Sequence, residues 1–185
     1  MNSFRFPWHL PFMRALMAAV EWVLRILVFK RHLPEVKEQV IDLAYGEHCQ
    51  QRLDLIRPTG QGPFPVLLYV HGGGWVSGDK SNFVWPTHWF ANKGLLVFNI
   101  NYRWAPEASF SEQVQDLACA LQYARQTCSK YGGDPDRLFM AGDSAGAHLV
   151  CWLHMASARL ELLHETALQE MPPASILRGS LLFYG

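Results

Sequence analysis

One short motif constrains the fold of this chain more than any other feature, namely Gly142-Asp143-Ser144-Ala145-Gly146. It directly follows the apolar run Leu138–Ala141 and opens a helical pattern that runs toward Leu160. The pattern Gly-x-Ser-x-Gly is a weak signal by itself, because small residues recur by chance. Between a strand and a helix it indicates a nucleophile elbow, a sharp turn that exposes a serine hydroxyl. An ordinary glycine-rich turn is the alternative.

The two glycines of this motif have a steric purpose. A serine at a sharp strand-to-helix turn is forced into a strained backbone conformation, and only small neighbours such as Gly142 and Gly146 leave room for it. The turn presents the hydroxyl at the carboxyl edge of the sheet, where the N-terminus of the following helix stabilises developing negative charge. We therefore interpret Ser144 as a candidate catalytic nucleophile.

A second motif, His71-Gly72-Gly73-Gly74-Trp75, directly follows the apolar run Pro65–Val70. Three consecutive glycines let the backbone approach a ligand closely and turn its N–H groups toward it. Such donors stabilise the oxyanion of a tetrahedral acyl intermediate, and losing one raises the barrier by about 3 kcal/mol. The N–H of Ala145, the residue after the serine, is the expected partner donor. A phosphate-binding loop fits poorly, because the lysine and remaining glycines of a P-loop are missing.

Beyond Pro34 the chain has the pattern of an α/β protein. Several of its short apolar runs are apolar at successive positions, as in strands that helices cover on both faces. The runs that predict strands are Val40–Tyr45, Leu53–Ile56, Pro65–Val70, Leu95–Ile100, Leu138–Ala141 and Ser180–Tyr184. Helices are predicted over Glu112–Lys130, where apolar residues recur at steps of three and four, and from Ser144 or Ala145 toward Leu160. This alternation predicts a mostly parallel sheet flanked by helices.

Charge and cysteine content narrow the class of function. Lys+Arg and Asp+Glu both number 16, so the formal net charge is zero, and neither nucleic acid nor a strongly basic partner is indicated. The four cysteines lie far apart without a Cys-x-x-Cys pair. This spacing argues against a zinc site or a disulfide framework, and it is typical of a reduced, cytoplasmic protein. No metal or cofactor is expected.

Residues 1–34 form a separate N-terminal segment, in which 10–29 are apolar except for Arg14, Glu21 and Arg25. Helical spacing places these three charges in one stripe. Three arrangements stay open. The helix lies in a membrane interface, or it caps the protein body and hides its apolar face there, or it spans a membrane despite three charges. A cleaved signal peptide fits poorly, because charges interrupt the apolar run.

At its two glycine motifs the chain resembles α/β-hydrolases of the esterase/lipase group, both the hormone-sensitive lipase-like and the BD-FAE-like esterases. It is also similar to arylformamidases, which share the His-Gly-Gly-x-Trp loop. The supporting matches are Gly78-Asp79-Lys80, Asn101-Tyr102-Arg103, Ala105-Pro106-Glu107, Glu112–Asp116 and 133–137. One departure is Ser111, where relatives usually carry proline. The match runs from about Tyr45 to Gly185, and it implies an α/β-hydrolase fold for a domain over residues 35–185.

The resemblance also implies roles for particular residues. Ser144 is then the nucleophile of a carboxylesterase that acts through an acyl-serine intermediate on a small-molecule ester. The oxyanion donors are Gly73, Gly74 and Ala145. Three further residues are expected to hold the loops, namely His71, Arg103 and Asp116. The resemblance also implies a preference for short or medium acyl groups, while formamidase and transacylase activities stay compatible with these residues.

Two parts of the expected catalytic triad are not found. The chain order of such a triad is serine, then acid, then histidine on later loops. The acidic residues after Ser144 precede the next strand, and the histidines there do not fit; they are Glu161, Glu165, Glu170, His148, His154 and His164. We therefore expect residues 35–185 to be a C-terminally incomplete, inactive two-thirds of the domain. The alternative function is that of a truncated isoform or fragment that acts at most as a binding module.

Overall fold

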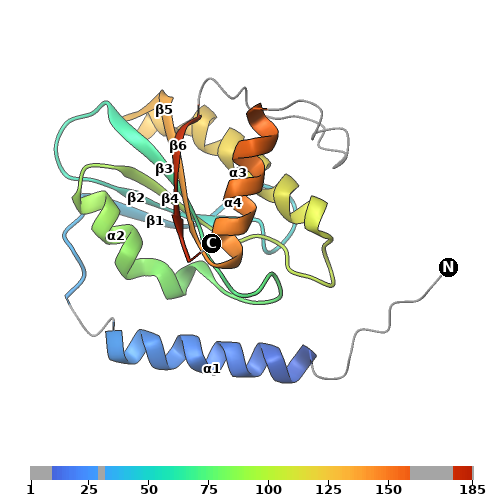
Figure 1. Ribbon diagram of the computed structural model, residues 1–185. Helices are drawn as coiled ribbons and strands as arrows, with labels where there is room; N and C mark the ends of the chain where they lie inside the picture. The colour runs from blue at the N-terminus through green and yellow to red at the C-terminus, as the bar shows by residue number, and fades with distance from the viewer. Residues whose placement is uncertain (1–9, 29–31, 159–176, 185) are drawn as a thin grey trace.

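The structure is a computed structural model that describes residues 10–28, 32–158 and 177–184. Its centre is a six-stranded sheet in the order β1-β2-β4-β3-β5-β6 (Figure 1). The strands are β1 Glu38–Ala44, β2 Arg52–Arg57, β3 Phe64–Val70, β4 Leu96–Ile100, β5 Gly133–Asp143 and β6 Leu177–Phe183. The strands β4, β3, β5 and β6 are parallel to one another, whereas β2 is antiparallel to both β1 and β4. The predicted fold class is confirmed, with a mixed sheet that is parallel over four strands.

Helices cover both faces of this sheet. Helix α2 (Val84–Asn92) packs on one face, and helices α3 (Phe110–Thr127) and α4 (Ala145–Ala158) pack on the other. The side chains of β3 alternate between two cores: Val66, Leu68 and Val70 contact the α3/α4 layer, whereas Leu67 and Tyr69 contact the α2 layer. Successive side chains of a strand point to opposite faces. The continuous apolar run in β3 is therefore the direct consequence of two covered faces.

The structure differs from the sequence expectations in a few places. Helix α2 and the 3-10 turn Lys80–Phe83 before it were not predicted, because α2 is largely apolar around its circumference and contains Pro86. That proline is tolerated because it lies in the first turn of the helix. The expected turn over residues 132–135 is shorter, since only Gly132 is left-handed, at φ 83°, and β5 begins at Gly133.

Helix α3 begins two residues before its predicted start. Ser109 is its N-cap: the Ser109 hydroxyl accepts a hydrogen bond from the N–H of Glu112, and the Glu112 carboxylate accepts from the N–H of Ser109. This capping box satisfies two N–H groups that have no partner inside the helix. The helix ends at Thr127, and a 3-10 turn, Cys128–Tyr131, continues the predicted helical range.

Helix α1 (Leu10–Val28) lies apart from the layers, across the loops that follow β3 and β4 (Figure 1). Arg14 donates hydrogen bonds to the carbonyl oxygens of Val76 (2.9 Å) and Ala105 (2.7 Å). No helix in the described ranges has the length and hydropathy that crossing a bilayer requires. Helix α1 thus contacts the body as a cap would, and its polar contacts are those of Arg14. The sequence analysis expected a cap helix to hide its apolar face in protein. The structure differs, because apolar side chains of α1 such as Phe12 and Leu16 are exposed.

Candidate active site

The backbone at Ser144 has the strain that the sequence motif predicts. Ser144 lies between β5 and α4 with a φ of 49°, and its side chain is exposed. A left-handed conformation is unfavourable for a residue other than glycine, so it persists only where the surrounding structure holds it. Here the Ser144 N–H donates to the carbonyl of Phe183 at 2.8 Å, and the Ser144 carbonyl accepts from His148 N–H at 3.0 Å.

The two glycines of this motif are the points of closest backbone approach. A Cβ on Gly146 would meet the carbonyl oxygens of Val70 and His71, and one on Gly142 would meet the backbone of Gly146. Any larger residue at these positions forces the elbow apart. The two glycines of the motif are therefore required by the packing of β5, α4 and the end of β3.

The glycine loop that follows β3 has a backbone that few residues can adopt. Gly73, Gly74 and Trp75 have φ angles of 132°, 60° and 63°. The Gly73 carbonyl accepts from the N–H groups of Val76 and Ser77, which closes the loop into a turn. Among the described residues, the N–H groups of Gly73, Gly74 and Ala145 donate to no acceptor. The glycine loop therefore keeps two backbone donors without a described acceptor, and the first residue of α4 adds a third.

The glycine loop and the serine turn lie against each other, although 66 residues separate them in the sequence. The Gly72 N–H donates to Asp143 Oδ1 at 3.0 Å. A Cβ on Gly72 would lie 3.2 Å from the Cβ of Ser144. Strands β3 and β5 are parallel neighbours in the sheet. Their carboxyl ends lie at the same edge, so the loops that follow them come together there.

Asp143, which the sequence interpretation left without a role, is the bridge between these loops. Its carboxylate accepts from Gly72 N–H and from the Tyr69 hydroxyl, the latter at 3.2 Å. Burial raises the pKa of Asp143, and these two hydrogen bonds oppose the rise. Burial and the nearby Asp143 carboxylate also raise the pKa of Tyr69. The sequence signal for the contact between Tyr69 and Asp143 was the hydroxyl-bearing Tyr69 inside the apolar run of β3.

His71 is a buried residue of the loop framework. Its ring stacks on Tyr102 with centroids 4.7 Å apart, and its Nδ1 lies 2.6 Å from the Gly72 carbonyl, to which it donates. Burial lowers the pKa of His71, which favours the neutral ring. The structure thus places His71 beneath the glycine loop, with its side chain fully enclosed.

Arg103 and Asp116 form a buried ion pair that holds the loop after β4. Arg103 donates to Asp116 through Nε and Nη2, the latter at 2.8 Å, and through its backbone N–H at 2.9 Å. Gln51 adds a fourth hydrogen bond to this carboxylate. Hydrogen bonding to Asp116 raises the pKa of Arg103. The described hydrogen bonds of this pair join α3 to the loop after β4 and to Gln51, which is a framework position.

The remaining histidines near the serine have other contacts. The His148 ring, one turn after Ser144, packs against Trp75 and Phe110 with centroid distances of 5.4 and 5.5 Å. The His154 ring is hydrogen bonded to Ser180. His164 and the acidic residues Glu161, Glu165 and Glu170 lie outside the described residues. Within the described ranges the Ser144 hydroxyl has no hydrogen-bond partner.

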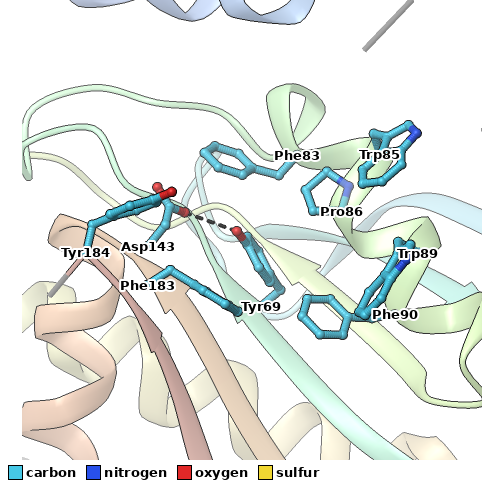
Figure 2. Close-up of a pocket in the computed structure, with 9 residues that line it drawn as sticks. All are labelled: Tyr69, Phe83, Trp85, Pro86, Trp89, Phe90, Asp143, Phe183 and Tyr184. Carbon is cyan, nitrogen blue, oxygen red and sulfur yellow. Dashed lines mark hydrogen bonds between the residues drawn. The ribbon is translucent and has the colours of Figure 1, made fainter. Parts of the chain in front are cut away.

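An aromatic pocket of about 410 Å³ borders the elbow on the α2 side of the sheet. Figure 2 shows the hydrogen bond from Tyr69 to Asp143 at its floor, with aromatic rings of α2 on one side and the end of β6 on the other. Its lining residues are Tyr69, Phe83, Trp85, Pro86, Trp89, Phe90, Asp143, Phe183 and Tyr184. The pocket walls are mostly apolar, and Asp143 is the acidic residue among the described residues that line the pocket.

A metal centre has no obvious place in this site. In the portion of the chain that the structure describes, no three His, Cys, Asp or Glu side chains are grouped as a metal ion would require. The site presents an exposed hydroxyl on a strained turn, and the glycine loop that contacts this turn has N–H groups without a described acceptor.

Comparison with known proteins agrees with this geometry. The BD-FAE family model matches residues 53–175, more than half of the chain. The chain belongs to the BD-FAE family. This BD-FAE chain is 32% identical over 125 residues to the isoprenylcysteine α-carbonyl methylesterase of Arabidopsis thaliana, covering 67% of this chain and 29% of the plant protein. It is 36% identical over 110 residues to the esterase LipC of Mycobacterium tuberculosis, covering 57% and 27%.

A solved structure shares the fold of this BD-FAE chain over nearly its whole length. Esterase B of Lactobacillus rhamnosis superposes with a TM-score of 0.84 at 24% identity, covering 94% of this chain and 57% of that one. The relatives of this BD-FAE chain are carboxylic ester hydrolases of the α/β-hydrolase fold. The chain spans less than a third of the length of the curated relatives that it matches.

Proposed function

We propose that this BD-FAE chain carries the nucleophile and the oxyanion donors of a serine carboxylesterase. The observation that supports this most directly is the contact between the strained Ser144 turn and the glycine loop, whose free N–H groups lie beside an exposed hydroxyl. In the reaction, the Ser144 oxygen attacks the carbonyl carbon of an ester. The carbonyl oxygen becomes an oxyanion, which the N–H groups of Gly73, Gly74 and Ala145 stabilise.

The rest of the cycle follows from the balance of protons. A general base takes the Ser144 proton, and the same group in its acid form returns it to the alcohol oxygen as the ester bond breaks. This leaves an acyl-Ser144, which water then hydrolyses to the carboxylic acid while the serine hydroxyl is restored. Asp143 and His71 do not take part in these proton transfers. They hold the glycine loop against the elbow.

The base is the missing part of this arrangement. A serine hydroxyl is a weak nucleophile without an adjacent base, and none of the described histidine rings is hydrogen bonded to the Ser144 hydroxyl. We therefore propose that residues 1–185 on their own turn over esters very slowly. Losing the triad base in related mechanisms lowers turnover by several orders of magnitude and leaves only oxyanion and binding effects.

Covalent labelling tests the nucleophile. A longer protein that also contains the triad acid and histidine of the family tests the base. In that longer protein a fluorophosphonate probe should label Ser144, and Ser144→Ala should abolish both labelling and the hydrolysis of short-chain aryl esters. The matched control is Ser129→Ala, a change at an exposed serine outside the site, which should keep both. Undiminished labelling of Ser144→Ala refutes the assignment of Ser144 as the nucleophile. Efficient turnover by residues 1–185 refutes the proposal that these residues lack the base.

A further inference from the structure

Helix α1 is bound to the body through one narrow face. Besides its two carbonyl contacts, Arg14 forms an ion pair with Glu107 at 2.9 Å and lies over the Trp104 ring. Met17, three residues later, accepts a hydrogen bond from Ser77 at its sulfur and lies against Gly74. Residues three apart lie on one side of a helix. The Arg14–Met17 face is therefore the side turned toward the glycine loop.

The opposite side of α1 carries an apolar stripe that nothing in the described structure covers. Phe12, Leu16 and Val23 are 68%, 54% and 43% exposed, and Ala19 between them is exposed too. Their steps of four, three and four residues put them on one line along the helix. At 100° per residue this line lies about half a turn from Arg14 and Met17. Met13 widens the exposed apolar surface at its side.

Charge is distributed unevenly between this segment and the rest of the chain. Residues 1–34 contain five basic side chains and one acidic one, whereas residues 35–185 contain eleven basic and fifteen acidic ones. The zero net charge of the chain therefore conceals a basic N-terminal segment and an acidic body. An apolar stripe on a basic segment is the combination that anionic lipid surfaces bind, through buried apolar area and electrostatic attraction together.

We propose that α1 is an interfacial helix that docks the protein on an anionic lipid surface through Phe12, Leu16, Ala19 and Val23. The helix lies on the surface and does not cross it. Because its opposite face contacts Gly74 and Ser77, docking places the glycine loop one helix diameter, about 10 Å, from the lipid. Docking then concentrates the site next to esters that partition into the bilayer, a consequence that rests on the proposed esterase function.

Vesicle co-sedimentation of the whole chain tests the docking without any need for turnover. The vesicles are phosphatidylcholine alone or phosphatidylcholine with phosphatidylserine. Leu16→Glu places a charge in the stripe, and the matched control is Met155→Glu, since Met155 is a helical residue of α4 that is 50% exposed. Each is also made in the Ser144→Ala background, so a failure of the esterase proposal leaves the binding result readable.

The expected result is binding to the anionic vesicles that weakens with added salt, as electrostatic attraction is screened. Leu16→Glu should lower the partition coefficient by about tenfold or more, the equivalent of losing one buried leucine, while Met155→Glu should leave it unchanged. Circular dichroism of both variants verifies that they fold. Equal partition of the two variants, or no binding to either vesicle, overturns the proposal. A dimer in light scattering that Leu16→Glu dissociates also overturns it, because a second copy then covers the stripe.

Discussion

Lys80 provides the sharpest test of how burial sets the energy of an ion pair in this fold. Its ammonium lies 2.7 Å from the carboxylates of both Asp42 and Asp54. The two distances are equal, but the Asp42 side chain is 66% exposed and that of Asp54 is 5% exposed. Burial by itself lowers the pKa of Lys80, and the hydrogen bonds with the two carboxylates outweigh it and raise the pKa.

The magnitudes follow from which charge is left without a partner. Lys80→Met keeps the length of the side chain, but among the described residues it leaves the Asp42 N–H as the only donor to the buried Asp54 carboxylate. Removing one partner of a buried pair lowers the free energy of unfolding by about 3–5 kcal/mol. Asp42→Asn removes an exposed partner at the same distance, and the expected loss is below about 1 kcal/mol. The double variant Lys80→Met/Asp54→Asn removes both buried charges, so it should recover part of the loss.

Urea unfolding followed by tryptophan fluorescence measures these three changes in one assay. The expected order of stability is wild type, then Asp42→Asn, then the double variant, with Lys80→Met the least stable. If Lys80→Met loses no more than Asp42→Asn, burial of the Asp54 carboxylate is not what determines the energy. A double variant less stable than Lys80→Met alone leads to the same conclusion, because the uncompensated charge is then not the cause.

Two further predictions concern the elbow. Gly146→Ala should destabilise the chain by about 3 kcal/mol or more, because its Cβ overlaps backbone carbonyls. The control is Gly179→Ala, whose added Cβ has its nearest neighbour 3.7 Å away and which should leave the thermal midpoint almost unchanged. Equal midpoints for the two variants contradict the close approach at Gly146. The raised pKa of Asp143 means that its protonated form stabilises the native state at low pH and that this contribution is lost as the pH rises through the folded pKa. Asp143→Asn should therefore gain stability relative to wild type as the pH rises above about 4, the ordinary pKa of an aspartate. A difference in urea midpoint between the two proteins that stays constant as the pH rises argues against a raised pKa.

The sequence by itself was enough to predict the fold class, because the signals involved are local. The apolar runs of β3 and β4 are continuous since both faces are covered, and glycine motifs mark the ends of β3 and β5. Boundaries were less accurate: β5 begins five residues before its predicted start, since Asp134 and Arg137 are polar residues that pair with each other at the exposed beginning of the strand.

Helix α2 shows where local signals fail. Its residues are apolar on nearly all sides, so no periodicity separates it from a strand or a loop. Its place is set by the α2 face of the sheet, where Phe90 and Ala91 fill the space over Val97 and Ile56. That space exists only after β2, β3 and β4 have paired, so tertiary packing decides that this segment is a helix.

The sequence by itself determined the candidate nucleophile and the glycine loop, because a strained turn and a close backbone approach each demand small residues at fixed spacing. Only the tertiary structure decided how α1 is turned. The stripe of charge could face either solvent or protein, and local helix geometry is identical in the two cases. The carbonyl oxygens of Val76 and Ala105 lie close enough together to accept from one guanidinium. Because that pair of acceptors forms only when the loops after β3 and β4 meet, the apolar face of α1 is left outward.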